Sequence, residues 1–177
     1  MPEIVCNTSP LQYLHQIGQL GVLPAVAGHV IVPAAVLVEL AEGRSRGVDL
    51  PSLDGLAWVT VRTPLSASAT PPIVGLGPGE TQVLALALEM PGAVVVLDDA
   101  RARRVAELRH IPRIGTLGLL LDAMRAGFLA AARPCVDQLQ LHGFRLAAHT
   151  RAAVLKLAGE REESPVWPGA QPGSGRA

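Results

Sequence analysis

Aromatic side chains and an excess of charge of either sign are both lacking in this sequence. Aromatic residues make up 3% of the chain and are scattered along it, so they form no series of rings on which successive bases could stack. Lys+Arg and Asp+Glu number 15 each, which gives a formal net charge of +0 and excludes a general electrostatic attraction to nucleic acid. Any site for a polyanion must therefore be a local patch.

Cysteine and long apolar runs are also scarce. The two cysteines, Cys6 and Cys135, neither build a disulfide framework nor match the spacing of metal ligands. No apolar stretch approaches the roughly 18 residues of a membrane helix, and the N-terminus has no basic segment followed by an apolar one. We therefore expect a protein of the reducing cytoplasm that does not span a membrane.

Apolar residues are abundant, and their pattern predicts the fold class. Hydrophobic residues make up 49% of the 177 residues, enough for one core between helix layers. Short β-branched runs alternate with segments of helical period, which predicts an α/β fold with a mostly parallel sheet and helices on both faces. The expected strands are 3–6, 29–32, 56–61, 93–97 and 112–115.

The helices predicted between these strands follow from period and capping residues. Ser9 is the expected N-cap of the first helix, with Pro10 in its first turn. Two or three further helices are expected after the last strand and before residue 160. The other expected helices are 33–43, 80–90, 101–109 and 116–126.

Composition predicts one domain and two irregular segments. The domain is expected over 1–159, and a disordered tail rich in Pro, Gly and polar residues over 160–177. Residues 64–72 predict a flexible surface connection. The stretch Gly75-Leu-Gly-Pro-Gly79 superficially resembles a phosphate-binding loop, but no strand precedes it and Pro78 lacks a backbone donor. A hinge or a loop that leads into a helix is the better interpretation.

Oxygen-bearing side chains gather where the predicted strands end. Asp98 and Asp99 follow the apolar run 92–97, and the carboxyl ends of parallel strands are where open α/β sheets bind ligands. Asn7 follows the first predicted strand, Glu39 lies in the helix after the second, and Glu80 opens a third helical segment. Four separated segments therefore carry oxygen ligands toward one edge of the sheet.

Such a cluster of carboxylates indicates a bound cation or basic neighbours, because like charges repel and are costly to desolvate. Oxygen ligands favour Mg²⁺ or Mn²⁺ over Zn²⁺. A metal held in this way can polarise a phosphoryl oxygen and generate hydroxide for in-line attack. The residues alone thus indicate phosphodiester or phosphomonoester chemistry.

Each of these side chains also has a simpler explanation. Asp99 is suited to capping the helix that follows it, and Glu80 to interacting with a helix dipole. Glu39 fits a solvated helix position and Asn7 an ordinary cap or turn, whereas Asp98 is less easily explained. Phosphate binding and a solvated face paired with acids both stay open for the arginines Arg101, Arg103, Arg104, Arg109 and Arg113.

Taken in order, these segments resemble the PIN domain family, in the bacterial and archaeal PIN-like group whose members open with Asn-Thr-Ser-Pro-Leu. The resemblance covers about residues 4–144. Each motif is short, but their order and spacing together are specific. The motifs are Asn7-Thr-Ser-Pro-Leu11, Val36-Leu-Val-Glu-Leu40, Gly77-Pro-Gly-Glu80, Val96-Leu-Asp-Asp-Ala-Arg101 and Ile114-Gly-Thr-Leu-Gly118.

This resemblance implies a three-layer α/β/α Rossmann-like fold. It also implies Mg²⁺- or Mn²⁺-dependent cleavage of RNA, typical of the ribonuclease toxins of toxin–antitoxin pairs. An RNA substrate, a small antitoxin and a homodimer are the partners that follow from it.

The resemblance also assigns roles to residues. Thr8 and Ser9 match small hydroxyl residues that orient water or a metal ligand, and Arg101 or Arg104 is expected to contact the RNA backbone. Glu39, Glu80 and Asp99 match family acids, and Asp98 is the neighbouring acid typical of this group. The expected catalytic residues are Glu39, Glu80, Asp98 and Asp99, which with Asn7 are also the expected metal ligands.

One position departs from the family pattern. The first family acid is ordinarily Asp, and this sequence has Asn7. The amide oxygen can coordinate a cation, but it carries no negative charge and cannot serve as a base. We hypothesise that Asp98 supplies the missing charge.

Two other functions stay open. The first is a catalytically weak or inactive PIN-like protein that binds RNA or a protein partner. The second is a small-molecule phosphatase or a receiver-like signalling domain, since both place aspartates after parallel strands. The receiver alternative requires a lysine partner, and the sole lysine, Lys156, lies too near the C-terminus to suit it.

Overall fold

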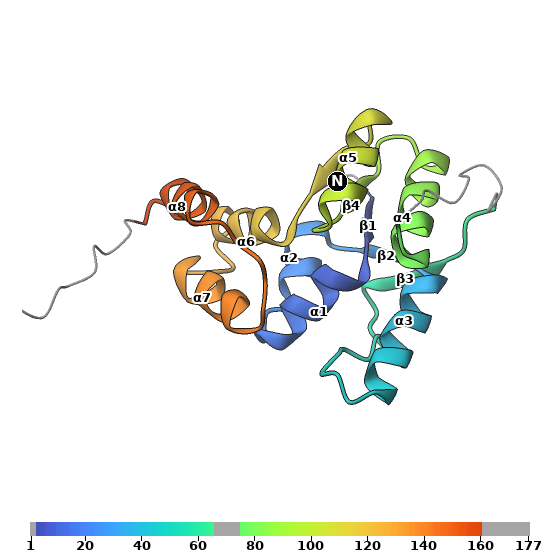
Figure 1. The fold of residues 1–177 in the computed structure, drawn as a ribbon, viewed down its shortest axis with the longest axis horizontal. Helices are drawn as coiled ribbons and strands as arrows, with labels where there is room; N and C mark the ends of the chain where they lie inside the picture. The colour runs from blue at the N-terminus through green and yellow to red at the C-terminus, as the bar shows by residue number, and fades with distance from the viewer. Residues whose placement is uncertain (1–2, 66–74, 161–177) are drawn as a thin grey trace, which may run out of the picture.

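The computed structural model describes residues 3–65 and 75–160, and its centre is a parallel sheet (Figure 1). The five strands lie in the order β3-β2-β1-β4-β5, and each neighbouring pair is parallel. The predicted α/β class with a parallel sheet is confirmed. The strands are β1 (Ile4–Cys6), β2 (Val30–Pro33), β3 (Val59–Arg62), β4 (Val94–Val96) and β5 (Arg113–Ile114).

Helices cover both faces of this sheet, which makes the three layers that the resemblance implied. Of the two or three C-terminal helices expected before residue 160, the described residues form two, α7 and α8 (Figure 1). The helices of the described residues are α1 (Thr8–Gln16), α2 (Val22–Ala27), α3 (Ala34–Ser45), α4 (Pro78–Glu89), α5 (Ala100–Leu108), α6 (Thr116–Arg125), α7 (Arg133–Leu141) and α8 (Ala148–Leu157).

The side chains of each inner strand alternate between two apolar cores. In β1, Ile4 and Cys6 pack into the core formed with α1, α2, α3 and α6, whereas Val5 packs into the core formed with α4 and α5. Successive strand residues point to opposite faces of a sheet, and both faces are buried here. This explains why the strands appear as continuous apolar runs rather than as alternating ones.

Two of the predicted boundaries are wrong. Ser9 is not the N-cap of the first helix, because α1 begins at Thr8 and the extended residue at its start is Asn7, with φ −87° and ψ 172°. The third strand begins at Val59 rather than at residue 56, because a turn in which the Val59 N–H donates to the Leu56 carbonyl precedes it.

Helix α2 was not predicted at all. It is six residues long, has Pro24 inside it, and is held in place by the burial of Val22, Leu23 and Ala27. So short a helix shows no helical period of its own, and tertiary packing stabilises it.

The glycine-rich stretch leads into a helix, as expected. Gly77 is the N-cap residue of α4, Pro78 occupies its first turn, and Gly75 has a φ of +87° that favours glycine. Most of the predicted connection over 64–72 and nearly all of the predicted tail lie outside the described residues, and the domain boundary at 159 stays a prediction. Within the described ranges, no helix is long and apolar enough to cross a membrane.

Candidate metal site at the carboxyl edge of the sheet

The central strands β1 and β4 deliver the first candidate residues to one edge. Cys6 pairs with Val96 in the parallel register, so Asn7 and the Asp98–Asp99 pair follow neighbouring strand ends. The Asn7 N–H also donates a hydrogen bond to the Val96 carbonyl at 3.3 Å. Residues about 90 positions apart in the sequence are thereby brought side by side, as the carboxyl ends of parallel strands require.

Asn7 is the one candidate whose side chain is buried without a partner. It is 3% exposed, it makes no capping hydrogen bond to α1, and its Oδ1 has no hydrogen-bond donor within the described part of the chain. Asn7 thus occupies the N-cap position of α1, but its side chain does not cap the helix. A buried acceptor without a donor costs roughly 1–3 kcal/mol, which a bound cation would offset.

Glu39 lies beside Asn7 and links three helices. One of its oxygens accepts a short hydrogen bond from the Thr8 hydroxyl, and the other accepts the Gly79 N–H at 2.8 Å. A Cβ atom at Gly79 would lie 2.7 Å from Glu39 Oε2 and 2.9 Å from Asn7 Oδ1. The two side chains therefore point to the same place, and only glycine fits opposite them.

Glu80 and Asp99 each use one oxygen for local structure. Glu80 Oε2 accepts the Gly77 N–H at 2.8 Å, and Asp99 Oδ1 caps α5 by accepting the Ala102 N–H at 2.8 Å. The second oxygen of each carboxylate has no hydrogen-bond partner among the residues that the structure describes. The predicted capping role of Asp99 is confirmed, and it leaves one oxygen available.

The charges of Asp99 and Glu39 act on Glu80. Burial raises the pKa of Glu80, the hydrogen bond from Gly77 opposes this, and the charges of Asp99 and Glu39 raise it further. Ser9 joins Glu80 and Asp99 in lining an open cleft of about 310 Å³. A bound cation would relieve the repulsion among these carboxylates.

Asp98 has a different environment from the other acids. Both of its oxygens accept hydrogen bonds from Thr116, one from the backbone N–H at 2.8 Å and one from the hydroxyl at 2.6 Å. Burial raises the pKa of Asp98, whereas the Thr116 hydrogen bonds and the charge of Arg103 lower it. Asp98 borders the cleft but is engaged with the start of α6.

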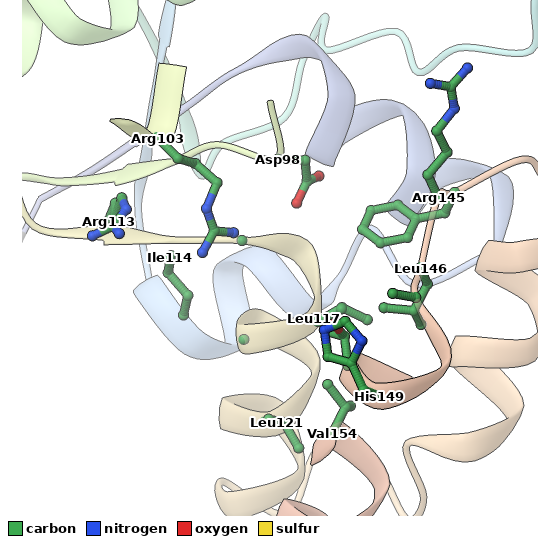
Figure 2. A pocket seen from close by; sticks show the side chains of 15 residues that line it. Asp98, Arg103, Arg113, Ile114, Leu117, Leu121, Arg145, Leu146, His149 and Val154 are labelled. Atoms are coloured by element: carbon green, nitrogen blue, oxygen red, sulfur yellow. The ribbon is translucent and has the colours of Figure 1, made fainter. Parts of the chain in front are cut away.

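The arginines of α5 differ in whether they form a solvated face paired with acids or are placed to bind phosphate. Arg104 pairs with Glu107 at 3.2 Å on the exposed face, as a solvated helix would. Arg101 donates to the Gly75 carbonyl at 3.4 Å, beside the loop that leads into α4. Arg103 instead faces Asp98 (Figure 2).

Sequence reasoning missed some residues of this region. Thr116 was present in a quoted motif, and its position at the first residue of α6 after β5 is the signal that could have identified it. Tyr13, Phe144 and Arg145 also line the cleft, and nothing in their local sequence indicated this.

A metal ion needs several donor atoms of suitable type held close together. Within residues 3–65 and 75–160, no group of three His, Cys, Asp or Glu residues is spaced to hold a metal. The residues that gather here instead combine one amide oxygen, from Asn7, with the carboxylates of Glu39, Glu80 and Asp99. These are hard oxygen donors of the kind that Mg²⁺ and Mn²⁺ prefer, and the Oδ1 of Asn7 lies next to Glu39, but the three carboxylates are not spaced as a metal-binding group in this structure.

Comparison with known proteins gives one match. A family model for the PIN domain matches residues 3–160, a range that includes every strand and helix given above. No curated protein and no solved structure matches the chain.

Proposed function

The chain belongs to the PIN domain family, which has a nuclease-type fold and typically uses divalent metals, and on this premise we propose that it is a Mg²⁺- or Mn²⁺-dependent endoribonuclease. The observation that carries the proposal is the buried, unpartnered Oδ1 of Asn7, which lies next to Glu39 at the carboxyl edge of the sheet. A buried acceptor in that state is stabilised by a hydrogen-bond donor or by a cation.

The proposal gives each oxygen donor a role. Asn7, Glu39, Glu80 and Asp99 hold the cation, and Asp98 adds negative charge from the rim. When bound, the cation supplies Lewis-acid stabilisation of the charge that develops on the phosphodiester. Glu80 offers the cation its Oε1, because its Oε2 already accepts the Gly77 N–H.

Four further residues position these groups and the substrate. The hydroxyl of Thr8 holds Glu39 in one orientation, and Ser9 lines the cleft where water and substrate enter. Arg101, which donates to the Gly75 carbonyl near the start of α4, or Arg104, one turn further along α5, contacts the RNA backbone in this proposal.

The biological setting extends the same proposal. We place the protein in the cytoplasm as the toxin of a toxin–antitoxin pair, with a small antitoxin as partner and a homodimer as its assembly. A small gene directly beside this one whose product inhibits cleavage supports that setting, and size-exclusion chromatography with light scattering checks the dimer.

A second candidate function is binding of RNA or a protein partner without turnover. Asn7 favours it, because the amide removes one negative charge from the site, and so does the lack of three suitably spaced carboxylates among the described residues. Binding of RNA in the absence of metal-dependent cleavage distinguishes this function from the first.

The test is cleavage of a mixed-sequence, end-labelled RNA pool with Mg²⁺, with Mn²⁺ or with EDTA. The matched variant is Asp99→Asn, since Asn caps a helix as well as Asp does and the change removes charge but not the cap. We expect metal-dependent cleavage by the wild type and none by Asp99→Asn. Retained cleavage by Asp99→Asn contradicts the proposed site.

Asn7→Asp completes the experiment. We expect it to raise the rate of cleavage, because the added charge increases metal affinity. Activity in Asn7→Asp but not in the wild type indicates a disarmed PIN fold and favours the second candidate. If neither the wild type nor either variant cleaves the RNA, the nuclease proposal is wrong.

A further inference from the structure

A second cleft, of about 610 Å³, lies next to the acidic edge, among β5, α6 and the segment that leads into α8 (Figure 2). Its volume falls within the roughly 300–1,000 Å³ that is usual for small-molecule sites. The floor is apolar, and Leu117 and Leu121 of α6 face Leu146 and Val154 across it. The metal site proposed above uses none of these four residues.

The rim of this cleft is basic. Arg103, Arg113 and Arg145 line it, and Asp98 is the one acid among its described lining residues. Both oxygens of Asp98 already accept hydrogen bonds from Thr116. Arg113 lies 3.7 Å from Glu107, which also forms an ion pair with Arg104. The rim therefore has an excess of positive charge.

Arg103 and Arg145 are the two cations best placed to take an anion. Arg103 points into the cleft, toward the space beside Asp98 (Figure 2). Arg145 is exposed, extends away from the floor, and forms no hydrogen bond or ion pair with the residues that the structure describes. Arginine is well suited to phosphate, because its planar guanidinium presents several N–H donors at once.

The two clefts adjoin, because three residues line both of them. Asp98, Phe144 and Arg145 line both the cleft that contains Glu80 and Asp99 and the one with the apolar floor. Phe144 is partly exposed at this boundary and is fixed by edge contact with Tyr13, with ring centroids 5.0 Å apart. A chain that leaves the acids must pass this ring and Arg145 before it reaches the floor.

We propose that the second cleft binds one nucleotide of a single RNA strand next to the cleaved bond, with its base on the apolar floor and its phosphate at Arg103 and Arg145. The inference rests on the proposed nuclease function, because the acids define which bond is adjacent. The occupant must place an anion and a flat apolar group within one cleft. A nucleotide has both, since every base offers an apolar face beside a phosphate.

The test measures binding rather than cleavage. Fluorescence anisotropy follows a labelled ten-nucleotide RNA, and the same strand without bases, added to the full chain in EDTA at several salt concentrations. The variants are Arg103→Ala, Arg145→Ala and Thr150→Trp, which fills the cleft from α8. Arg125→Ala is the matched control, because Arg125 lies at the opposite end of α6 and pairs with Asp122.

We expect the wild type to bind the intact strand more tightly than the abasic one. Arg103→Ala and Arg145→Ala each weaken binding roughly fivefold or more and lower the salt slope by about 0.7, the value for one phosphate contact with a single strand. Thr150→Trp removes the difference between the two strands, and Arg125→Ala behaves as the wild type. Circular dichroism and thermal unfolding confirm that each variant is folded.

If the wild type binds the intact and abasic strands equally well, the base site is overturned. If Arg103→Ala and Arg145→Ala bind RNA as tightly as Arg125→Ala does, the phosphate site is overturned. No binding by the wild type overturns both. Because the assay contains no metal, the two proposals fail separately. Intact cleavage without these effects contradicts only the cleft, and these effects without cleavage contradict only the nuclease.

Discussion

Thr116 donates two hydrogen bonds to Asp98, one to each carboxylate oxygen, and is itself fully buried. The pair joins the end of β4 to the first residue of α6, across 18 positions of sequence. It also separates Asp98 from the other acids, because both of its oxygens are directed to α6. The apolar floor described above begins on that same helix.

We expect Thr116→Val to destabilise the fold by about 2 kcal/mol, because it removes a buried hydrogen bond to a charged group. The backbone N–H still reaches Asp98, so the variant should fold. Thr116→Ser is the control, since it retains the hydroxyl and loses one methyl group, at about 1 kcal/mol. Urea unfolding measures both, and equal losses in the two variants would show that the hydroxyl contributes nothing.

Glu80→Gln should stabilise the protein at neutral pH and lower its activity. A carboxyl group whose pKa is higher in the folded chain contributes stability when protonated. For Glu80 that contribution is complete below the ordinary pKa of 4.5 and is lost as the pH rises through the raised value. Glutamine removes the repulsion from Asp99 and Glu39 and can still accept the Gly77 N–H.

The gain from Glu80→Gln should stay below about 1 kcal/mol, because the side chain is partly exposed and solvent screens the repulsion. Thermal unfolding between pH 4 and pH 8 measures it, and the difference between variant and wild type should shrink at the acid end. A constant difference across that range would show that Glu80 ionisation does not cause it.

Gly79→Ala should disrupt the site. The new Cβ would lie within 2.9 Å of oxygens of both Asn7 and Glu39, and the Glu39 carboxylate is held in place by hydrogen bonds from Thr8 and Gly79. We expect a loss of roughly 1–3 kcal/mol, typical of overpacking, together with loss of metal binding. Gly21→Ala is the control, because its Cβ would meet only Phe128 at 3.5 Å.

Metal affinity tests whether Asp98 compensates for Asn7. Calorimetric titration with Mn²⁺ should show tighter binding in Asn7→Asp and weaker binding in Asp98→Ala, because each change alters the negative charge near the cation. Thr116→Val serves as a comparison for Asp98→Ala, because it removes a hydrogen bond to Asp98 but leaves the charge of Asp98 in place. Wild-type affinity in Asp98→Ala would refute the compensation.

Local patterns were enough for the architecture. The apolar runs marked all five strands, the helix predicted from Glu80 is α4, which begins two residues earlier at Pro78, and capping by Asp99 was among the interpretations weighed for that residue. Helix α2 was missed because six residues show no period, and the start of α1 was displaced because Ser9 and Asn7 are both acceptable caps.

The residues at the ends of the strands can be identified from the amino-acid sequence, because backbone geometry alone sets the periods of strands and helices. Which of their oxygens remain available depends on contacts between distant segments. The Glu39 carboxylate accepts the Gly79 N–H from 40 positions away, Asp98 accepts hydrogen bonds from Thr116 18 positions away, and the Oδ1 of Asn7 has no donor among the described residues. Hydrogen-bond partners so distant are chosen by packing, and no local pattern encodes them.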